Sequence, residues 1–217
     1  MTDLSTARNA MIDGQLRPNK VTDDRVVDAI ATVPRERFVP KGLRGVAYVD
    51  EDLEVAPGRF LMEPMVFARL VTAAEPTAAD SVLNVGCTTG YSAAVLAQLA
   101  DAVVALEQDE ALVASATEKL AEVGIDNVAV INGRLVDGAA GQGPFSLIFL
   151  DGAVERVPEA LTDQLADGGR LVCVKRTDGI GRGHLITKVG GQLGGRDLFD
   201  ASVPLLPGFE VADRFVF

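Results

Sequence analysis

The chain has 217 residues, with 20 lysines and arginines against 31 aspartates and glutamates, so its formal net charge is −11. This charge argues against nucleic acid and against an anionic membrane surface as partners, because both normally require a basic excess. The length and an apolar fraction of 48% suffice to bury a core without a structural metal. The single histidine, His184, excludes a multi-histidine metal site.

The cysteines and the N-terminal sequence favour a cytoplasmic protein. Cys87 and Cys173 show no metal-ligand spacing, and two isolated cysteines are typical of a reducing compartment. Residues 1–10 lack a basic segment followed by an apolar one, so we expect no secretory signal. No apolar run approaches the roughly 20 residues that a membrane-spanning helix needs.

Residues 1–76 read as a helical extension. Leu4, Ala7 and Met11 recur at helical spacing. A second helix is expected from a cap at Thr22 to about Val33. The stretch 34–58 is rich in proline and glycine and reads as irregular, and we expect a third helix to begin at Pro64.

Residues 77–217 read as a Rossmann-like core in the same single domain. Apolar runs predict strands over residues 81–85, 102–106, 128–131, 145–150 and 169–175, separated by helices over 93–99, 109–124 and 158–165. The stretches 185–189 and 196–203 flank a glycine cluster and predict an antiparallel hairpin. The expected fold is α/β, a doubly wound and mostly parallel sheet with an antiparallel C-terminal hairpin and an N-terminal helical extension.

A glycine-bounded turn follows the first strand of this core. Gly86 and Gly90 bracket it, and a helix opens directly after it, which is the arrangement that brings backbone close to a nucleotide. Glu107 ends the next strand, where an acid can accept both ribose hydroxyls of a nucleoside. Two alternatives stay open: the glycines serve only a tight turn, and Glu107 is a solvated carboxylate beside other acids.

Several motifs along nearly the whole chain resemble the protein-L-isoaspartate O-methyltransferase family. They are MIDGQLR at 11–17, VPRERFVP at 33–40, GYSAAVLA at 90–97 and VPEAL at 157–161. The resemblance implies the class I methyltransferase fold and S-adenosylmethionine as cofactor. It also implies methyl transfer to the α-carboxyl of isoaspartyl residues in damaged proteins, a repair reaction.

This implied chemistry needs no strong general base, since the acceptor carboxylate is already a nucleophile, and alignment and exclusion of water supply most of the rate. A single histidine is therefore no obstacle, and no catalytic residue is assigned. The resemblance places the substrate loop at Arg59, Phe60, Leu61, Met62 and Glu63. It places cofactor contacts at Asn84, Gly86, Cys87, Thr88, Gly90, Glu107, Gln108, Gly133, Arg134 and Asp151.

The acceptor loop departs from the family pattern. The family has Gln-Thr-Ile-Ser-Gln-Pro where residues 59–64 stand here, and its serine contacts the substrate carboxyl. Met62 takes the place of that serine and cannot donate a hydrogen bond. Glu63 adds a negative charge beside an anionic substrate, which Arg59 could compensate.

The cofactor motifs also depart from it. Asn84 stands where the family has an acid, Thr88 replaces the middle glycine, Arg134 replaces an acid that faces adenine, and Asp151 occupies a threonine position. If each altered contact costs about 1 kcal/mol, the summed loss is about a thousandfold in affinity. The alternatives are therefore a catalytically inactive relative that acts as a binding or scaffold protein, or an enzyme with another methyl acceptor.

Three further features have weaker functional interpretations. Cys87 lies at a helix N-terminus where a thiolate is stabilised, although filling a small site is the commoner role. His184 is expected at the surface or at a sheet edge. The acids over residues 50–54 are expected to form a solvated run.

Overall fold

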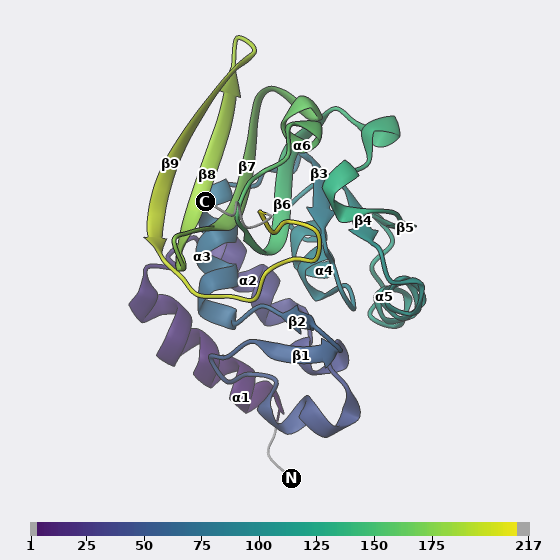
Figure 1. The fold of residues 1–217 in the computed structure, drawn as a ribbon. Helices are drawn as coiled ribbons and strands as arrows, with labels where there is room; N and C mark the ends of the chain where they lie inside the picture. The colour runs from purple at the N-terminus through teal and green to yellow at the C-terminus, as the bar shows by residue number, and fades with distance from the viewer. Residues whose placement is uncertain (1–3, 212–217) are drawn as a thin grey trace, which may run out of the picture.

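The computed structural model describes residues 4–211. A seven-stranded sheet in the order β5-β4-β3-β6-β7-β8-β9 forms its centre (Figure 1). The first five strands in this order pair in parallel, and β8 and β9 are antiparallel. The bounds are β3 Ser81–Val85, β4 Ala102–Glu107, β5 Val128–Asn132, β6 Phe145–Val154, β7 Leu165–Thr177, β8 Ile180–Val189 and β9 Gln192–Asp200. The expected α/β fold is confirmed.

Alternation along the buried strands produces a core on each face of the sheet. Val82 and Phe149 belong to the core shared with the N-terminal helices, whereas Leu83 and Ile148 belong to the opposite core. Phe67 packs its ring 5.5 Å from that of Phe149. The helices are α1 Leu4–Met11, α2 Asp24–Thr32, α3 Pro64–Ala74, α4 Tyr91–Ala97, α5 Glu110–Glu122 and α6 Glu159–Asp163.

The helix ends follow the sequence signals with one correction. Asp109 caps α5 as expected, accepting hydrogen bonds from the backbone N–H groups of Ala111 and Leu112. The expected cap of α2 at Thr22 is wrong. Asp23 is the cap, and its carboxylate accepts from the N–H of Arg25. A carboxylate at this position also interacts favourably with the helix dipole, which explains why it replaces the neighbouring hydroxyl.

The stretch expected to be irregular contains a small antiparallel hairpin. Strands β1 (Leu53–Ala56) and β2 (Arg59–Leu61) pair across the Pro57–Gly58 turn. The acids before it are not simply solvated: Asp50 and Asp52 accept the N–H groups of Met65 and Glu63 at 3.1 and 2.9 Å. They satisfy free donors at the start of α3, so that part of the expectation is wrong.

The expected C-terminal hairpin is present as β8 and β9, with Gly190 and Gly191 at its turn. Gly194 and Gly195 lie within β9 instead of in the turn. His184 is 9% exposed, and its Nδ1 lies 2.7 Å from Asp197, so the expected surface position is wrong.

After β9 the chain continues as an irregular segment with a turn at residues 207 and 208, and we call residues 203–211 the strap (Figure 1). It is tied to the end of β6, because Leu206 donates its N–H to the carbonyl of Ala153 and Ala153 donates to Pro204. Phe209 is buried. Over the described range 4–211, none of the helices has the length and apolarity to cross a bilayer.

Candidate active site

The glycine turn lies between β3 and α4, at the carboxyl ends of the parallel strands. Gly86 and Gly90 have φ angles of +81° and +95°, in the left-handed region that favours glycine. Thr88 adopts φ +49° between them, and its Oγ1 is buried with no hydrogen-bond partner among residues 4–211. The β-branched residue therefore occupies a strained position inside the turn.

Glu107 ends β4 directly opposite this turn and is completely buried. Its carboxylate accepts the backbone N–H groups of Thr88, Gln108 and Asp109 at 3.0, 2.8 and 3.1 Å. The alternative of a solvated Glu107 is wrong. Three backbone donors hold the carboxylate toward the turn, where a bound nucleoside would meet it.

Arg59 of β2 already binds this carboxylate. Its Nη1 pairs with Oε1 of Glu107, and its Nη2 donates to Oε2 at 2.7 Å and to the carbonyl of Gly86 at 3.3 Å. The Arg59 side chain is only 6% exposed. Arg59 therefore neutralises Glu107 and does not compensate Glu63.

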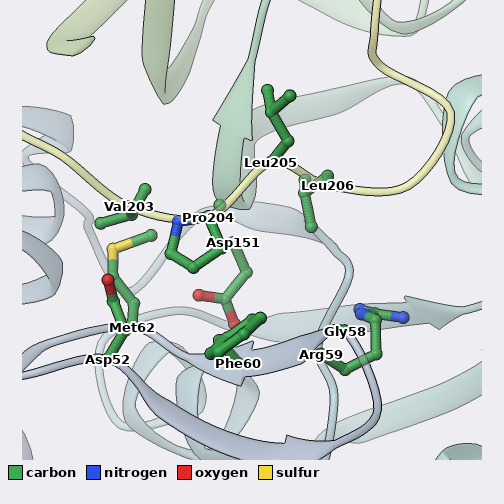
Figure 2. A pocket seen from close by; sticks show the side chains of 11 residues that line it. Asp52, Gly58, Arg59, Phe60, Met62, Asp151, Val203, Pro204, Leu205 and Leu206 are labelled. Carbon is green, nitrogen blue, oxygen red and sulfur yellow. The ribbon is translucent and has the colours of Figure 1, made fainter.

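Leu206 of the strap fills the space next to Gly86 of the turn and Gly152 of β6. A Cβ added at Gly86 would lie 2.7 Å from Leu206 Cδ2, and one added at Gly152 would lie 2.8 Å from Leu206 Cγ. A cavity of about 10 Å³ remains between the β1–β2 hairpin, the end of β6 and the strap (Figure 2). That space suits about one water molecule.

Asp151 is buried beside this cavity. Figure 2 shows its side chain between the strap and Phe60 of the hairpin. Burial raises the pKa of Asp151 to about 7, although its hydrogen bond with Ser92 and the nearby Arg59 act in the opposite direction. The Ser92 hydroxyl also lies 2.9 Å from Asn84 Oδ1. Since a hydroxyl has one proton, a neutral Asp151 that donates to Ser92 satisfies all three groups.

The acceptor side of the cavity is apolar and acidic. Met62 is buried, and its carbonyl accepts from Nη2 of the fully buried Arg35 at 2.8 Å. Burial raises the pKa of Asp52 to about 6 and that of Glu63 to about 7, the latter also through repulsion from Asp52. Nη1 of Arg35 is buried without a partner within the described part of the chain.

Some of the residues assigned by resemblance lie together and others do not. Residues 59, 60, 62, 86, 107 and 151 meet around the cavity and the Glu107 carboxylate. Gln108 is exposed, and Arg134 points its guanidinium into solvent, with 76% of the side chain exposed, where it pairs with Asp137 at 3.3 Å. Gly133 donates its N–H to the carbonyl of Glu107. The ligand roles of all these residues stay predictions.

Cys87 is a buried thiol within the turn. Burial raises its pKa, and the negative charges of Glu107 and Asp151 add to the effect. Burial also raises the pKa of Cys173, to about 12. A helix N-terminus does not produce a thiolate here, because the thiol is desolvated.

We expect neither Cys87 nor Cys173 to react with a thiol reagent such as dithionitrobenzoate in the native state at pH 8. Both thiols should then react completely in guanidinium chloride. The absorbance of the released thiolate measures this directly, and rapid modification of one thiol in native protein would contradict the burial described above.

Sequence reasoning did not identify Leu206, Ser92 or Arg35 as members of the site. Leu206 lies in a segment with no periodic pattern, and it reaches the cleft only through the strap. Ser92 and Arg35 lie within motifs that were used for the resemblance, and no spacing rule links either of them to Asp151. The available signal was that both are polar residues inside the quoted motifs.

A family model and two curated relatives point to the same family. The model of the protein-L-isoaspartate(D-aspartate) O-methyltransferase family matches residues 6–189. A protein-L-isoaspartate O-methyltransferase of Koribacter versatilis is 39% identical over 207 residues, which cover 95% of this chain and 93% of that protein. One from Methylorubrum extorquens is 36% identical, with 97% and 93% covered.

Two solved structures share the fold. One is a protein-L-isoaspartate O-methyltransferase, with a TM-score of 0.80, 24% identity and coverage of 93% of this chain and 66% of that one. The other, from Plasmodium falciparum in complex with S-adenosyl-L-homocysteine, has a TM-score of 0.77, 22% identity and coverage of 90% and 96%. With the family match over most of its length, the chain belongs to the protein-L-isoaspartate O-methyltransferase family.

Proposed function

We propose that this protein transfers a methyl group from S-adenosylmethionine to the carboxyl of isoaspartyl residues in damaged proteins. The observation that carries the proposal is the family match at 39% identity across 95% of the chain. The comparisons do not favour the alternative of an inactive or re-purposed relative. S-adenosylhomocysteine bound to the Plasmodium falciparum relative supports the cofactor.

In the structure described, side chains occupy the space beside Gly86 and Glu107 where this cofactor is expected to bind. The carboxylate expected to meet a ribose is paired with Arg59, and the side chain in front of Gly86 is Leu206. The cavity beside Asp151, of about 10 Å³, holds about one water molecule and adds no room for a ligand. Binding therefore requires the hairpin or the strap to move.

The protein's own contribution to the reaction is to position the acceptor and exclude water. An isoaspartyl carboxylate needs no proton removed before it attacks, so the buried acids are not required as bases. Asp52 and Glu63 with raised pKa values would place less negative charge beside an anionic acceptor near pH 6–7 than ordinary carboxylates would. The apolar side chains of Met62 and Phe60 exclude water from this side.

The direct test is transfer of labelled methyl groups to an isoaspartyl peptide. A peptide with normal aspartate at the same position is the control, since it differs only in backbone connectivity. We expect base-labile label on the isoaspartyl peptide alone. No label above the enzyme-free blank, with high enzyme and cofactor and with the cleft-opening variants described below, would contradict the proposal.

Met62→Ser is expected to raise methylation of the isoaspartyl peptide about tenfold or more, because a hydroxyl would replace a thioether where the family contacts the substrate carboxyl. The same change removes a buried side chain and should lower the free energy of unfolding by about 2–5 kcal/mol. Met62→Ala is the matched control, since it opens the same space without a donor. An equal gain in the alanine variant would contradict a role for the hydroxyl.

We further propose that residues 1–76 and 77–217 belong to one methyltransferase-like domain, which a core continuous from α1 to β7 supports. A cytoplasmic location is proposed from the unpaired thiols of Cys87 and Cys173 in the described chain. The family match supports a damaged protein or peptide as partner, and the net charge of −11 argues against a nucleic acid.

A further inference from the structure

The cofactor cleft is closed by two segments that are far apart in the sequence. Arg59 comes from the hairpin near the N-terminus, and Leu206 comes from the strap near the C-terminus (Figure 2). Both reach the glycine turn. Arg59 Nη2 lies 3.4 Å and Leu206 Cδ2 lies 2.7 Å from a Cβ placed on Gly86. The space next to Gly86 is therefore filled by the side chains of Arg59 and Leu206.

Arg59 binds Glu107 in the way a ligand with two adjacent donors would. Its two terminal nitrogens donate to the two carboxylate oxygens, as a pair of ribose hydroxyls at this position would donate. The remaining hydrogen bonds of Glu107 come from backbone N–H groups of residues 88, 108 and 109, and these do not depend on the hairpin. The carboxylate can therefore exchange one forked donor for another without losing its orientation.

Resting on the proposed function, we propose that Arg59 is an internal competitor for the ribose site, and that the hairpin and the strap form a gate closed by Arg59 and Leu206. Cofactor binds after the guanidinium leaves Glu107. The apparent affinity then equals the intrinsic affinity multiplied by the fraction of molecules in which the gate is open. Residues of both segments line the cavity beside Asp151, and Arg59 and Leu206 both lie against Gly86, so we expect opening of one segment to favour opening of the other.

The hairpin is built in a way that suits this movement. It has two short strands, and its turn carries Gly58 at φ +68°, whose N–H is held by the exposed Glu54 side chain at 2.9 Å. It forms its own two-stranded sheet and is not part of the seven-stranded one. Displacing it breaks the Arg59 ion pair and exposes Leu53 and Leu61, which belong to the core, but it leaves the hydrogen bonds of the central sheet intact.

The test measures S-adenosylhomocysteine binding by calorimetry in the wild-type protein and in Arg59→Gln, Leu206→Ala and the double variant. Glutamine is neutral, and it is the residue that the family's substrate loop has at the position of Arg59. Arg17→Gln is the matched control, because Arg17 is 50% exposed and pairs with Asp13 and Asp24 instead of Glu107. We expect tenfold or greater tightening in Arg59→Gln, a further gain in the double variant and no change in the control.

Hydrogen exchange of peptides covering residues 53–61 and 203–211 measures opening of the gate directly, both without and with ligand. We expect Arg59→Gln to speed exchange in both segments, and saturating S-adenosylhomocysteine to do the same in the wild-type hairpin. Equal affinity of wild type and Arg59→Gln, or unchanged exchange in both segments, would overturn the gate.

The two proposals fail in different ways. No binding by any variant, the double variant included, would contradict both the gate and the cofactor of the proposed function. Binding that tightens as expected, with no methyl transfer to the isoaspartyl peptide, would support the gate and contradict the acceptor. A circular dichroism melt of each variant shows that it is folded.

Discussion

Glu107→Gln is expected to lower the free energy of unfolding by about 3–5 kcal/mol, the usual cost of removing one partner from a buried ion pair. The substitution preserves the volume of the side chain, so the loss comes from charge and hydrogen bonding. Arg59 would remain 6% exposed with its cationic group opposite a neutral amide. The amide nitrogen would also face backbone donors at Thr88 or Gln108, which need an acceptor.

The partner substitution should cost much less. In Arg59→Gln, the Glu107 carboxylate keeps its three backbone N–H donors at 2.8–3.1 Å, so the buried charge that remains is still solvated by the protein. The double variant Arg59→Gln/Glu107→Gln should be more stable than Glu107→Gln alone, because it contains no unpaired buried cation. The gate requires this difference in stability, because the Glu107 carboxylate must stay in place when Arg59 leaves it.

Urea unfolding followed by circular dichroism measures these differences, with midpoints compared at constant slope. Glu110→Gln is a control of the same chemistry on the exposed first turn of α5 and should change the free energy of unfolding by less than about 1 kcal/mol. Equal destabilisation by Arg59→Gln and Glu107→Gln would contradict the view that the backbone donors hold the carboxylate independently of Arg59.

The sheet could be predicted from the sequence because its strands are buried on both faces, so they stand out as apolar runs between helical segments. Val82, Leu83 and Val85 show this in β3, and Asp109 marked the start of α5 through ordinary capping chemistry. The glycine turn and Glu107 were placed by the same logic, since parallel strands end at one edge.

The closure of the cleft could not be predicted in this way. Arg59 and Glu107 are 48 residues apart, and the pairing depends on a hairpin whose two strands are too short to show a period. Leu206 is an ordinary leucine in an aperiodic segment, and only the tertiary path of the strap brings it onto Gly86. Arg134 replaces an acid that the resemblance places against adenine, but its side chain is exposed.

Asp151→Asn is expected to stabilise the protein at pH 8, a direction opposite to that of most buried substitutions. Desolvation raises the pKa of Asp151 to about 7 in the folded state, compared with an ordinary value of 3.8 for an aspartate. The folded protein therefore binds the proton more tightly than the unfolded chain, and this contribution to stability decreases as pH rises from about 4 to about 7. Asparagine removes that loss and can donate its amide to the Ser92 hydroxyl, as the protonated acid does.

The stability difference between Asp151→Asn and wild type should therefore grow in favour of the variant by about 1.4 kcal/mol per pH unit across this window and level off above pH 7. Glu63 and Asp52 contribute a dependence of the same sign in both proteins, because their pKa values are also raised. They cancel in the difference. Free energies of unfolding in urea at pH 5, 6, 7 and 8 measure it, with the exposed Asp137→Asn as control. Parallel curves for Asp151→Asn and wild type would show that Asp151 is ionised throughout, held so by Arg59 and Arg35, and that the network with Ser92 and Asn84 is not built around a neutral acid.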